Sequence, residues 1–542
     1  MQLKVNYVDI PNRQIYPALV SIEQQKISHI TRLREEELLP HYMIPGFVDA
    51  HVHIESSMLV PTEFARLAVR HGTVGTVSDP HEIANVLGIE GVEYMLDNAQ
   101  QSPFKFNFGA PSCVPATPFE SAGAVIGPDE VAQLLARPDI KYLAEVMNYP
   151  GVIQRIPDMM AKIAAAQAVN KPVDGHAPGV RGKDIEQYIV AGISTDHECF
   201  TLEEALEKLH LGMKILIREG SAAKNFEALI DLLPQHADQV MFCSDDKHPD
   251  DLLVGHINQL AARAVAKGIP VFEVLQAACL NPVTHYGLEI GGLQEGDWAD
   301  FALVHDLKNF EVYATYINGE LVAKEGKDYL NRVTPALLNN FHTTSKKVED
   351  FALPASTANI QIIQAIDGEL ITKKNQATAL IQEGLAIADP SRDILKMTVV
   401  NRYQDSPPAL AFIQGFELKE GALASCVGHD SHNIIAVGTS DEAICQAVNL
   451  LIDHQGGIAV VSTQEEKVLP LPIAGILSAQ SGEEVAAAYS ELDKLAKSTL
   501  GCPLRAPFMT LSFMALLVIP DLKLSDKGLF DGSQFEFTPL FV

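Results

Sequence analysis

Short β-rich runs alternate with longer helical patterns from residue 44 onward, and this rhythm constrains the fold more than any other feature of the chain. Eight runs can be read, at residues 44–49, 72–78, 105–109, 140–146, 172–175, 192–196, 213–218 and 239–244. Helical patterns lie between them, at 61–71, 89–100, 154–169, 201–209 and 225–233. Such alternation builds parallel sheets, so residues 44–284 are predicted to form an α/β structure, a (β/α)8 barrel of the TIM type. A doubly wound open sheet is the competing architecture.

The segments on both sides of this region indicate a second, smaller unit. Residues 19–22 and 26–30 have the pattern of a hairpin, and residues 312–317 and 320–322 form another around Asn318-Gly319. We expect residues 1–43 and 285–340 to pair in one small β-sandwich. Residues 345–542 are predicted to be an additional C-terminal α+β domain, with strands at 378–381, 434–437 and 457–462 and helices at 441–451, 483–499.

Composition narrows the classes of partner. Hydrophobic residues make up 47% of the 542 residues and charged residues 20%, which is typical of a globular chain with a large core. The formal net charge of −29 argues against nucleic acid or an anionic membrane as a partner, because both require a basic face. No stretch approaches 18 uninterrupted apolar residues, and the amino terminus lacks the apolar segment of a signal peptide.

The seven cysteines are scattered singly, without a C-x-x-C pair. An odd, dispersed set in a long chain is typical of reduced thiols, so we expect a cytoplasmic protein. We also expect a homo-oligomer, specifically a dimer.

Two histidines end the first run of the predicted barrel. His51 and His53 are spaced i, i+2, and side chains alternate faces along a strand, so the two imidazoles point the same way. Two converging imidazoles make half of a metal site. The alternative, a pair of solvated loop histidines, is disfavoured by the preceding apolar run and by the polar residues that end later runs.

Barrel enzymes place their reactive groups at the C-terminal ends of the strands, so the residues that end the other runs matter most. These are Glu145, His176, His197 and Asp245. Taken singly, Glu145 has an alternative as a structural ion-pair partner, and each histidine as a hydrogen-bonded core residue. Together with His51 and His53, the six suit two divalent cations with one bridging carboxylate, and such a pair lowers the pKa of a shared water.

We therefore predict that His51 and His53 bind one metal, that His176 and His197 bind the other, and that Glu145 bridges them. Asp245 is predicted to bind the first metal and to accept the proton of the attacking water. Glu145 and Asp245 are thus the expected catalytic residues.

Weaker candidates for substrate contact are His81, Glu82, Glu198, Arg218 and Asp246. His81 and Glu82 are equally well explained as an extra cation site or as residues that support ligands or cap a helix. Arg218 and its neighbour Glu219 either read the substrate edge, orient ligands or form an ion pair between strands. In the C-terminal unit, His429 and His432 either face the barrel mouth or lie in a solvated turn.

The pattern of His-x-His followed by Glu, His, His and Asp on later strands resembles the amidohydrolase superfamily. Further segments resemble, more closely, its bacterial adenine deaminases. They are MIPGFVDAHVHIESS (43–57), SDPHEIANV (78–86), AEVMNYPGV (144–152), GHAPG (175–179), GISTDHE (192–198), REGS (218–221), AGILS (474–478), GCP (501–503) and PFMTLSF (507–513). The likeness spans nearly the whole chain. The segment before residue 43 is shorter than is usual in that family.

The resemblance implies hydrolysis of a 6-aminopurine with two bound divalent ions, commonly manganese or iron, with zinc as a further option. It also implies a glutamate bridge where many relatives carry a carboxylated lysine. Lys141 lies four residues before Glu145, nearer the barrel bottom, and is rejected as the bridge. Ring N1 of the purine would need a proton, and Glu145, Glu198 and Asp246 remain open as its source.

Three other functions fit the sequence less well. A cyclic-amide hydrolase such as a dihydropyrimidinase or dihydroorotase usually needs the carboxylated lysine. A non-catalytic scaffold would be expected to lose metal ligands, and here all six are present. The zinc cytidine deaminases are excluded because no P-C-x-x-C follows His53-x-Glu55.

Overall fold

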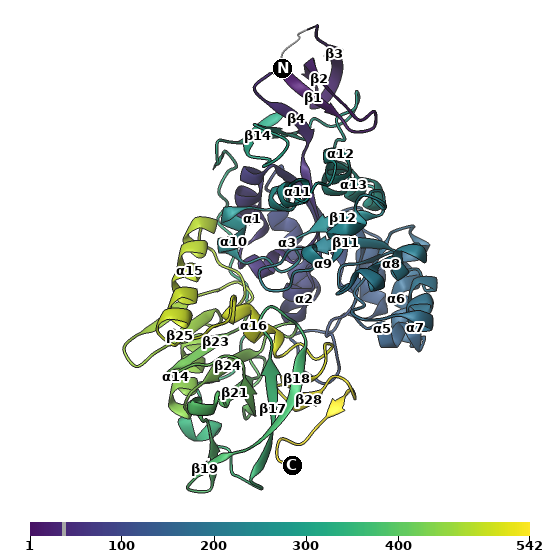
Figure 1. Ribbon diagram of the computed structural model, residues 1–542. Coiled ribbons are helices and arrows are strands. Elements are labelled where there is room, and N and C mark those ends of the chain that lie inside the picture. Colours follow the sequence, from purple (N-terminus) through teal and green to yellow (C-terminus); the bar gives the residue numbers. More distant parts are fainter. Residues whose placement is uncertain (35–38) are drawn as a thin grey trace.

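The computed structural model describes residues 1–34 and 39–542. Three regions follow one another along the molecule (Figure 1). A β-sheet that contains the amino terminus lies at one end, parallel strands with their helices lie in the middle, and a mostly-sheet C-terminal domain lies at the other end.

The terminal sheet draws strands from both flanks of the parallel region. Its order is β16-β15-β14-β13-β4-β1-β2-β3. The strands are β1 (Gln2–Asp9), β2 (Gln14–Glu23), β3 (Lys26–Arg32), β4 (Tyr42–Pro45), β13 (Phe301–Val304), β14 (Val312–Ile317), β15 (Glu320–Lys324) and β16 (Lys327–Asp328). Tyr7, Val20 and Phe301 are buried in its apolar core. Chain segments almost 300 residues apart therefore share one core.

The first predicted run divides into two strands. β4 pairs with β1 and β13 in the terminal sheet, whereas β5 (Phe47–Val52) begins the parallel region. Gly46 lies between them, and a Cβ at that position would lie 2.3 Å from Val74 Cγ1. A glycine is needed at this crossing because no larger residue fits.

Parallel strands carry the residues of the predicted metal site. One sheet has the order β5-β6-β7-β8-β9 and a second the order β10-β11-β12. The bounds are β6 (Thr73–Ser78), β7 (Lys105–Ala110), β8 (Ile140–Val146), β9 (Val173–Gly175), β10 (Thr195–Asp196), β11 (Lys214–Arg218) and β12 (Val240–Cys243). Asp245, just after β12, donates its N–H to His51 O at 2.9 Å and accepts at its carbonyl from His53 N at 3.2 Å. The first and last strands of the series therefore meet.

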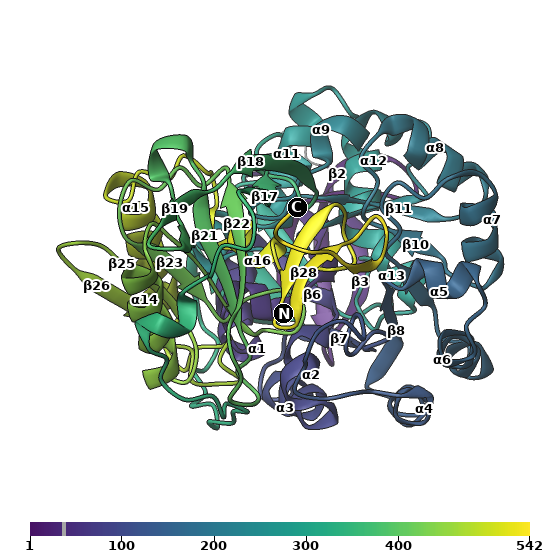
Figure 2. The ribbon, with the colours of Figure 1, turned by 90° about the horizontal axis from the view of Figure 1, so that it is seen from below.

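Helices alternate with these strands and run along their outer side, as Figure 2 shows for α4 to α9. They are α1 (Pro61–Ala68), α2 (His81–Leu87), α3 (Ile89–Ala99), α4 (Pro128–Leu135), α5 (Tyr149–Ile153), α6 (Pro157–Ala168), α7 (Gly182–Val190), α8 (Leu202–His210), α9 (Phe226–Leu229), α10 (Pro249–Val254), α11 (Ile257–Ala266), α12 (Val271–Leu275) and α13 (Asn281–Tyr286).

The predicted helix at 154–169 differs from the structure in its start. Its first two residues, Gln154 and Arg155, instead form a turn after α5, in which Arg155 has a φ of 55°. Pro157 then takes the first position of α6, where its missing N–H costs nothing. The proline thus determines where the helix begins.

The C-terminal domain is built on one mixed sheet of order β18-β17-β22-β21-β24-β23-β25-β26. Its strands are β17 (Asn359–Ala365), β18 (Thr372–Thr378), β21 (Leu395–Val400), β22 (Ala409–Gln414), β23 (Ala422–Ser425), β24 (Ile434–Gly438), β25 (Ile458–Val461) and β26 (Glu466–Leu469). Smaller sheets are β19 (Leu380–Gln382) with β20 (Leu385–Ile387), and β27 (Leu522–Ser525) with β28 (Gly528–Asp531) and β29 (Glu536–Phe537). Its helices are α14 (Asp441–Asp453), α15 (Gly482–Ser498) and α16 (Pro507–Phe513).

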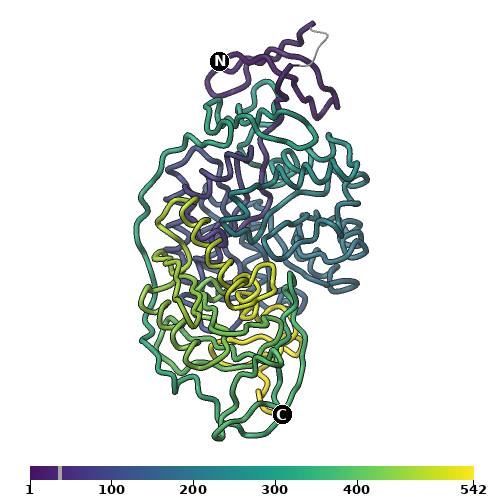
Figure 3. The backbone as a smooth tube through the Cα atoms, turned by 60° about the vertical axis from the view of Figure 1, so that its left-hand side comes forward, coloured from purple at the N-terminus to yellow at the C-terminus, as the bar shows by residue number. Residues whose placement is uncertain are grey.

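A long connection leads from β16 into this domain and passes along one side of the molecule (Figure 3). Two hydrogen bonds tie it to the parallel region: Tyr94 Oη donates to Ala336 O at 2.9 Å, and Asn340 Nδ2 donates to Val86 O at 2.9 Å. The domain also pairs directly with the chain after β5, since Ser478 N donates to Met58 O at 2.8 Å.

These contacts place α16 and β28 across the carboxyl ends of the parallel strands (Figure 2). Within residues 1–34 and 39–542, none of the helices combines the length and the apolar character needed to cross a bilayer.

Candidate active site

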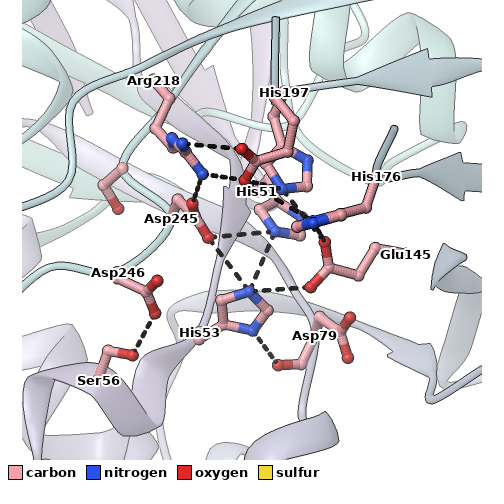
Figure 4. A network of polar contacts seen from close by, with 12 residues as sticks. His51, His53, Ser56, Asp79, Glu145, His176, His197, Arg218, Asp245 and Asp246 are labelled. Atoms are coloured by element: carbon pink, nitrogen blue, oxygen red, sulfur yellow. Dashed lines mark hydrogen bonds and ion pairs between the residues drawn. The ribbon is translucent and has the colours of Figure 1, made fainter. Parts of the chain in front are cut away.

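Three side chains at the ends of β5 and β12 form a tight triangle. His51 Nε2 lies 3.2 Å from His53 Nε2 and 3.5 Å from Asp245 Oδ1, and His53 Nε2 lies 3.2 Å from the same oxygen. All three residues are buried. Figure 4 shows them pointing toward one another.

These separations match the ligand shell of one metal ion. Ligands held at about 2.0–2.2 Å and at tetrahedral to octahedral angles lie roughly 3.0–3.6 Å from each other. Two imidazole nitrogens and a carboxylate oxygen are donors that suit Mn²⁺, Fe²⁺ or Zn²⁺.

Glu145, at the end of β8, faces two groups of histidines at once. Its Oε1 lies 3.3 Å from His53 Nε2, while its Oε2 lies 2.9 Å from His176 Nδ1 and 3.2 Å from His197 Nε2. One oxygen therefore points at each group, which is the arrangement that a bridging carboxylate needs (Figure 4).

The second group contains His176, after β9, and His197, after β10. Glu198 Oε1 lies 3.5 Å from His197 Nε2 and 3.7 Å from His176 Nδ1. His176 Nε2 has no hydrogen-bond partner among the residues that the structure describes, and it is buried. Nδ1 is therefore the nitrogen of His176 that faces Glu145 and Glu198 and is available as a ligand there.

Neighbouring groups hold the ligands in orientation. His53 Nδ1 lies 3.2 Å from Asp79 O, a contact that leaves Nε2 facing the triangle. Arg218 Nη1 lies 2.5 Å from Asp245 Oδ2 and also pairs with Glu198. The guanidinium thus turns the other oxygen of Asp245 toward His51 and His53. Among the roles predicted for Arg218, this geometry favours the one in which it orients the predicted metal ligand Asp245.

Glu219 lies outside this network. Its carboxylate pairs with Arg263 Nη1 at 2.6 Å and with Lys224 Nζ at 3.7 Å, on the outer side of β11. It takes no part in the site.

The carboxylates are held in their charged form although they are buried. Burial raises the pKa of Glu145, but His176 and His197 outweigh it and keep the pKa well below its usual range. Burial also raises the pKa of Asp245, but Arg218, His51 and His53 outweigh it and keep the pKa well below its usual range. Burial lowers the pKa of His197, yet Glu145 raises it to about 9.

The carboxylates therefore raise the pKa of His53, His176 and His197 and favour protons on these imidazoles, whereas burial lowers the pKa of His51. A divalent cation can take the place of those protons, because metal binding releases protons from histidine ligands. The donor set, its separations and its negative charge all fit a divalent cation.

The C-terminal domain closes the pocket above these ligands. Leu370, His429, Asp430, Phe513 and Leu516 line it together with the residues from the strand ends. His429 and His432 are 5% and 1% exposed, so the solvated turn considered for them is wrong. His429 Nε2 lies 2.9 Å from Glu82 Oε1 and 3.1 Å from Asp246 Oδ1, which connects the two domains.

The weaker candidates also lie at this pocket. His81 Nδ1 is 3.5 Å from Glu145 Oε1, and Asp246 accepts a hydrogen bond from Ser56 Oγ at 2.5 Å. Glu82 lies behind them, against His432 Nε2. The structure thus brings all of the predicted site residues to one end of the parallel strands.

Several residues of the site were not predicted. Asp79 precedes His81 in the same segment, so its position directly after the second run could have identified it. Leu370, Phe513 and Leu516 carry no local signal, because only the docking of the C-terminal domain brings these apolar side chains to the pocket.

Parallel strands that end in four histidines, two carboxylates and an orienting arginine define a metal-dependent hydrolase. Residues 42–322 match the amidohydrolase family, and residues 369–536 match the adenine deaminase C-terminal domain. The chain belongs to the amidohydrolase family, whose members use divalent metal ions.

Within that family the chain groups with the adenine deaminases over its whole length. It is 58% identical over 537 residues to an adenine deaminase of Sulfurovum sp. (strain NBC37-1), with 99% of each chain covered. It is 54% identical to an adenine deaminase of Salinibacter ruber, with 99% of this chain and 98% of the relative covered. It is 50% identical to one of Parabacteroides distasonis, with 100% and 98% covered.

Proposed function

We propose that this protein hydrolyses adenine to hypoxanthine and ammonia. Water adds to C6 of the purine, and the exocyclic amine leaves as ammonia, so that C6 carries a carbonyl in the product. The observation that carries the proposal is the position of Glu145, with one oxygen facing each group of histidines. The three relatives described above, each named adenine deaminase, support the choice of substrate.

Two divalent ions, Mn²⁺ or Fe²⁺ with Zn²⁺ as a further option, are part of the proposal. The first ion would be held by His51, His53 and Asp245. The second would be held by His176 and His197, and Glu145 would contact both ions. When bound, such a pair lowers the pKa of a water so that hydroxide is available at neutral pH. The separations of the donor atoms support this assignment.

Asp245 is the proposed proton carrier. It would accept the proton of the attacking water and then deliver it to the departing amine. The contact of its Oδ2 with Arg218 leaves Oδ1 facing the pocket, which supports this role.

Glu198 and Asp246 are the candidates for protonating ring N1. Glu145 is a poorer candidate for this proton transfer because both of its oxygens face histidine nitrogens. Glu198 is paired with Arg218, whereas Asp246 faces His429 across the pocket. The two variants Glu198→Gln and Asp246→Asn identify the residue that donates the proton to N1. The fall of kcat at high pH reflects deprotonation of this acid, so only the variant that lacks it should lose this basic limb of the pH profile.

Ammonia release tests the function as a whole. The Mn²⁺-loaded protein is expected to release ammonia from adenine and not to open the rings of hydantoin or dihydroorotate. Ring opening without ammonia release would assign the protein to the cyclic-amide hydrolases instead. No turnover of any of these compounds by the metal-loaded protein would support a scaffold role.

The domain architecture, cellular location and oligomeric state are also part of the proposal. We propose that β5 to β12 close into a full (β/α)8 barrel spanning residues 44–284, that residues 1–43 and 285–340 form a small β-sandwich, and that residues 345–542 form an α+β domain. The contact of Asp245 with His51 and His53 supports the closure. A cytoplasmic location is supported by seven buried, unpaired cysteines among the described residues. The proposed homodimer is tested by light scattering on the purified protein.

A further inference from the structure

A second group of potential metal ligands lies between the parallel strands and the C-terminal domain. His81 and Glu82 begin α2, and Asp430 comes from the loop between β23 and β24. One donor atom from each lies within 4.8 Å of the others. We refer to these three residues as the interdomain cluster. They are 2%, 1% and 2% exposed.

Polar atoms of the interdomain cluster are buried without a complete set of partners. His81 Nε2 and Asp430 Oδ2 make no hydrogen bond to any residue within 1–34 or 39–542. Leaving such a group unsatisfied costs about 1–3 kcal/mol, so its persistence calls for a bound ion or water.

The separations in the interdomain cluster are too long for hydrogen bonds but close to those of metal ligands. His81 Nε2 lies 3.6 Å from Glu82 Oε1 and 3.7 Å from Asp430 Oδ1. Ligands around one ion, at about 2.0–2.2 Å from it, lie roughly 3.0–3.6 Å apart. An inward movement of a few tenths of an ångström would therefore complete the shell.

The neighbours of His81 and Glu82 also suit a metal site. His81 Nδ1 lies 3.1 Å from Asp79 Oδ2, so a carboxylate stands behind the imidazole as is usual for metal-bound histidines. His429 Nε2 lies 2.9 Å from Glu82 Oε1 and offers a fourth donor from the C-terminal domain.

The interdomain cluster is distinct from the pair of sites around Glu145. The Nδ1 edge of His81 faces Glu145, whereas its Nε2 edge faces Glu82 and Asp430. None of the six ligands assigned above belongs to the cluster. We propose that His81, Glu82 and Asp430 bind a further divalent cation, which fastens the C-terminal domain over the pocket.

Metal content measures this directly. The full-length protein and its Asp430→Ala variant would be saturated with Mn²⁺, desalted and analysed by plasma mass spectrometry. We expect the variant to hold about one Mn²⁺ fewer per subunit than the unchanged protein, because it lacks one of three ligands. Glu82→Gln, which keeps the side-chain volume, should lose the same equivalent. Asp405→Ala is the matched control, since this exposed carboxylate pairs with Lys346 in the same domain.

A second readout is the link between the domains. Mn²⁺ should raise the melting temperature of the unchanged protein and of Asp405→Ala by more than that of Asp430→Ala or Glu82→Gln, because binding to the folded state stabilises it. Equal Mn²⁺ content in the unchanged protein and in folded Glu82→Gln would overturn the proposal, and so would a loss of the same size in Asp405→Ala. These outcomes depend on a difference in metal content and not on activity, so they are independent of the proposed reaction.

Discussion

Replacing Asp245 by asparagine is the sharpest test of the proposed proton carrier. Asparagine suits the position better than alanine because the backbone of Asp245 has a φ of 53°, a left-handed conformation that asparagine tolerates well. The amide has nearly the same shape as the carboxylate, but it cannot accept the proton of the attacking water. The change therefore removes the chemistry and keeps the backbone geometry.

The expected loss follows from the contacts of Asp245. General acid–base catalysis contributes about 10²–10⁴ in rate, so kcat should fall at least about a hundredfold, which is roughly 2.7 kcal/mol or more. The amide oxygen can still accept a hydrogen bond from Arg218, so the variant loses only the charge assistance, about 1–1.5 kcal/mol of folding stability. Arg218 keeps its pairing with Glu198, so no unpaired charge is left and the fold should persist.

The assay is ammonia release from adenine with Mn²⁺-loaded protein, alongside metal analysis and urea unfolding. Glu219→Gln is the matched control, because its carboxylate pairs with Arg263 outside the site. Its kcat should stay within about twofold of the unchanged protein, because the buried carboxylate of Glu219 contacts Arg263 and Lys224 and none of the predicted metal ligands. If Asp245→Asn bound a full complement of metal and kept kcat within about tenfold, Asp245 would not be the proton carrier.

Three further changes probe the metal bridge, the core and the pH dependence. Glu145→Gln should lower the metal content measured by mass spectrometry, because its oxygens face different histidine groups and the amide nitrogen cannot serve as a ligand; unchanged content would exclude the bridge. Lys208→Met should lower the free energy of unfolding in urea by about 3–5 kcal/mol, since it leaves Asp196 and Glu204 buried without their cation; a change below about 1 kcal/mol would contradict this. Burial lowers the pKa of His71 to about 4, so the unfolded chain binds the proton more readily between pH 6.5 and 4. Stability should therefore be present above about pH 6.5 and fall by up to about 3 kcal/mol as the pH is lowered to 4. His71→Gln should flatten that fall in urea titrations at several pH values, and an unaltered slope would show that His71 does not cause it.

Much of the ligand set was predictable because a strand imposes a simple rule. His51 and His53 alternate with Val52 and so face the same side, and the residues that end later runs meet them wherever parallel strands stand side by side. The structure brings all six predicted ligands together. Whether each binds a metal stays a prediction.

The boundaries of elements were less predictable. The first run divides at Gly46 because β4 joins a sheet made with β13, a strand more than 250 residues later. The strand predicted at 192–196 shortens to Thr195–Asp196, since Gly192 has a φ of 112° and belongs to the preceding turn. Local pattern does not contain such long-range pairing.

By itself, the sequence determined the alternation of strands and helices, because this follows from local periodicity. It also determined which predicted metal ligands end each strand and which face of the strand they occupy. The part of the pocket that the C-terminal domain lines was decided only by tertiary structure. Leu370, His429 and Phe513 reach the site because the C-terminal domain docks on the strand ends. Docking depends on the fit of two completed surfaces, and neither surface exists until each domain has folded.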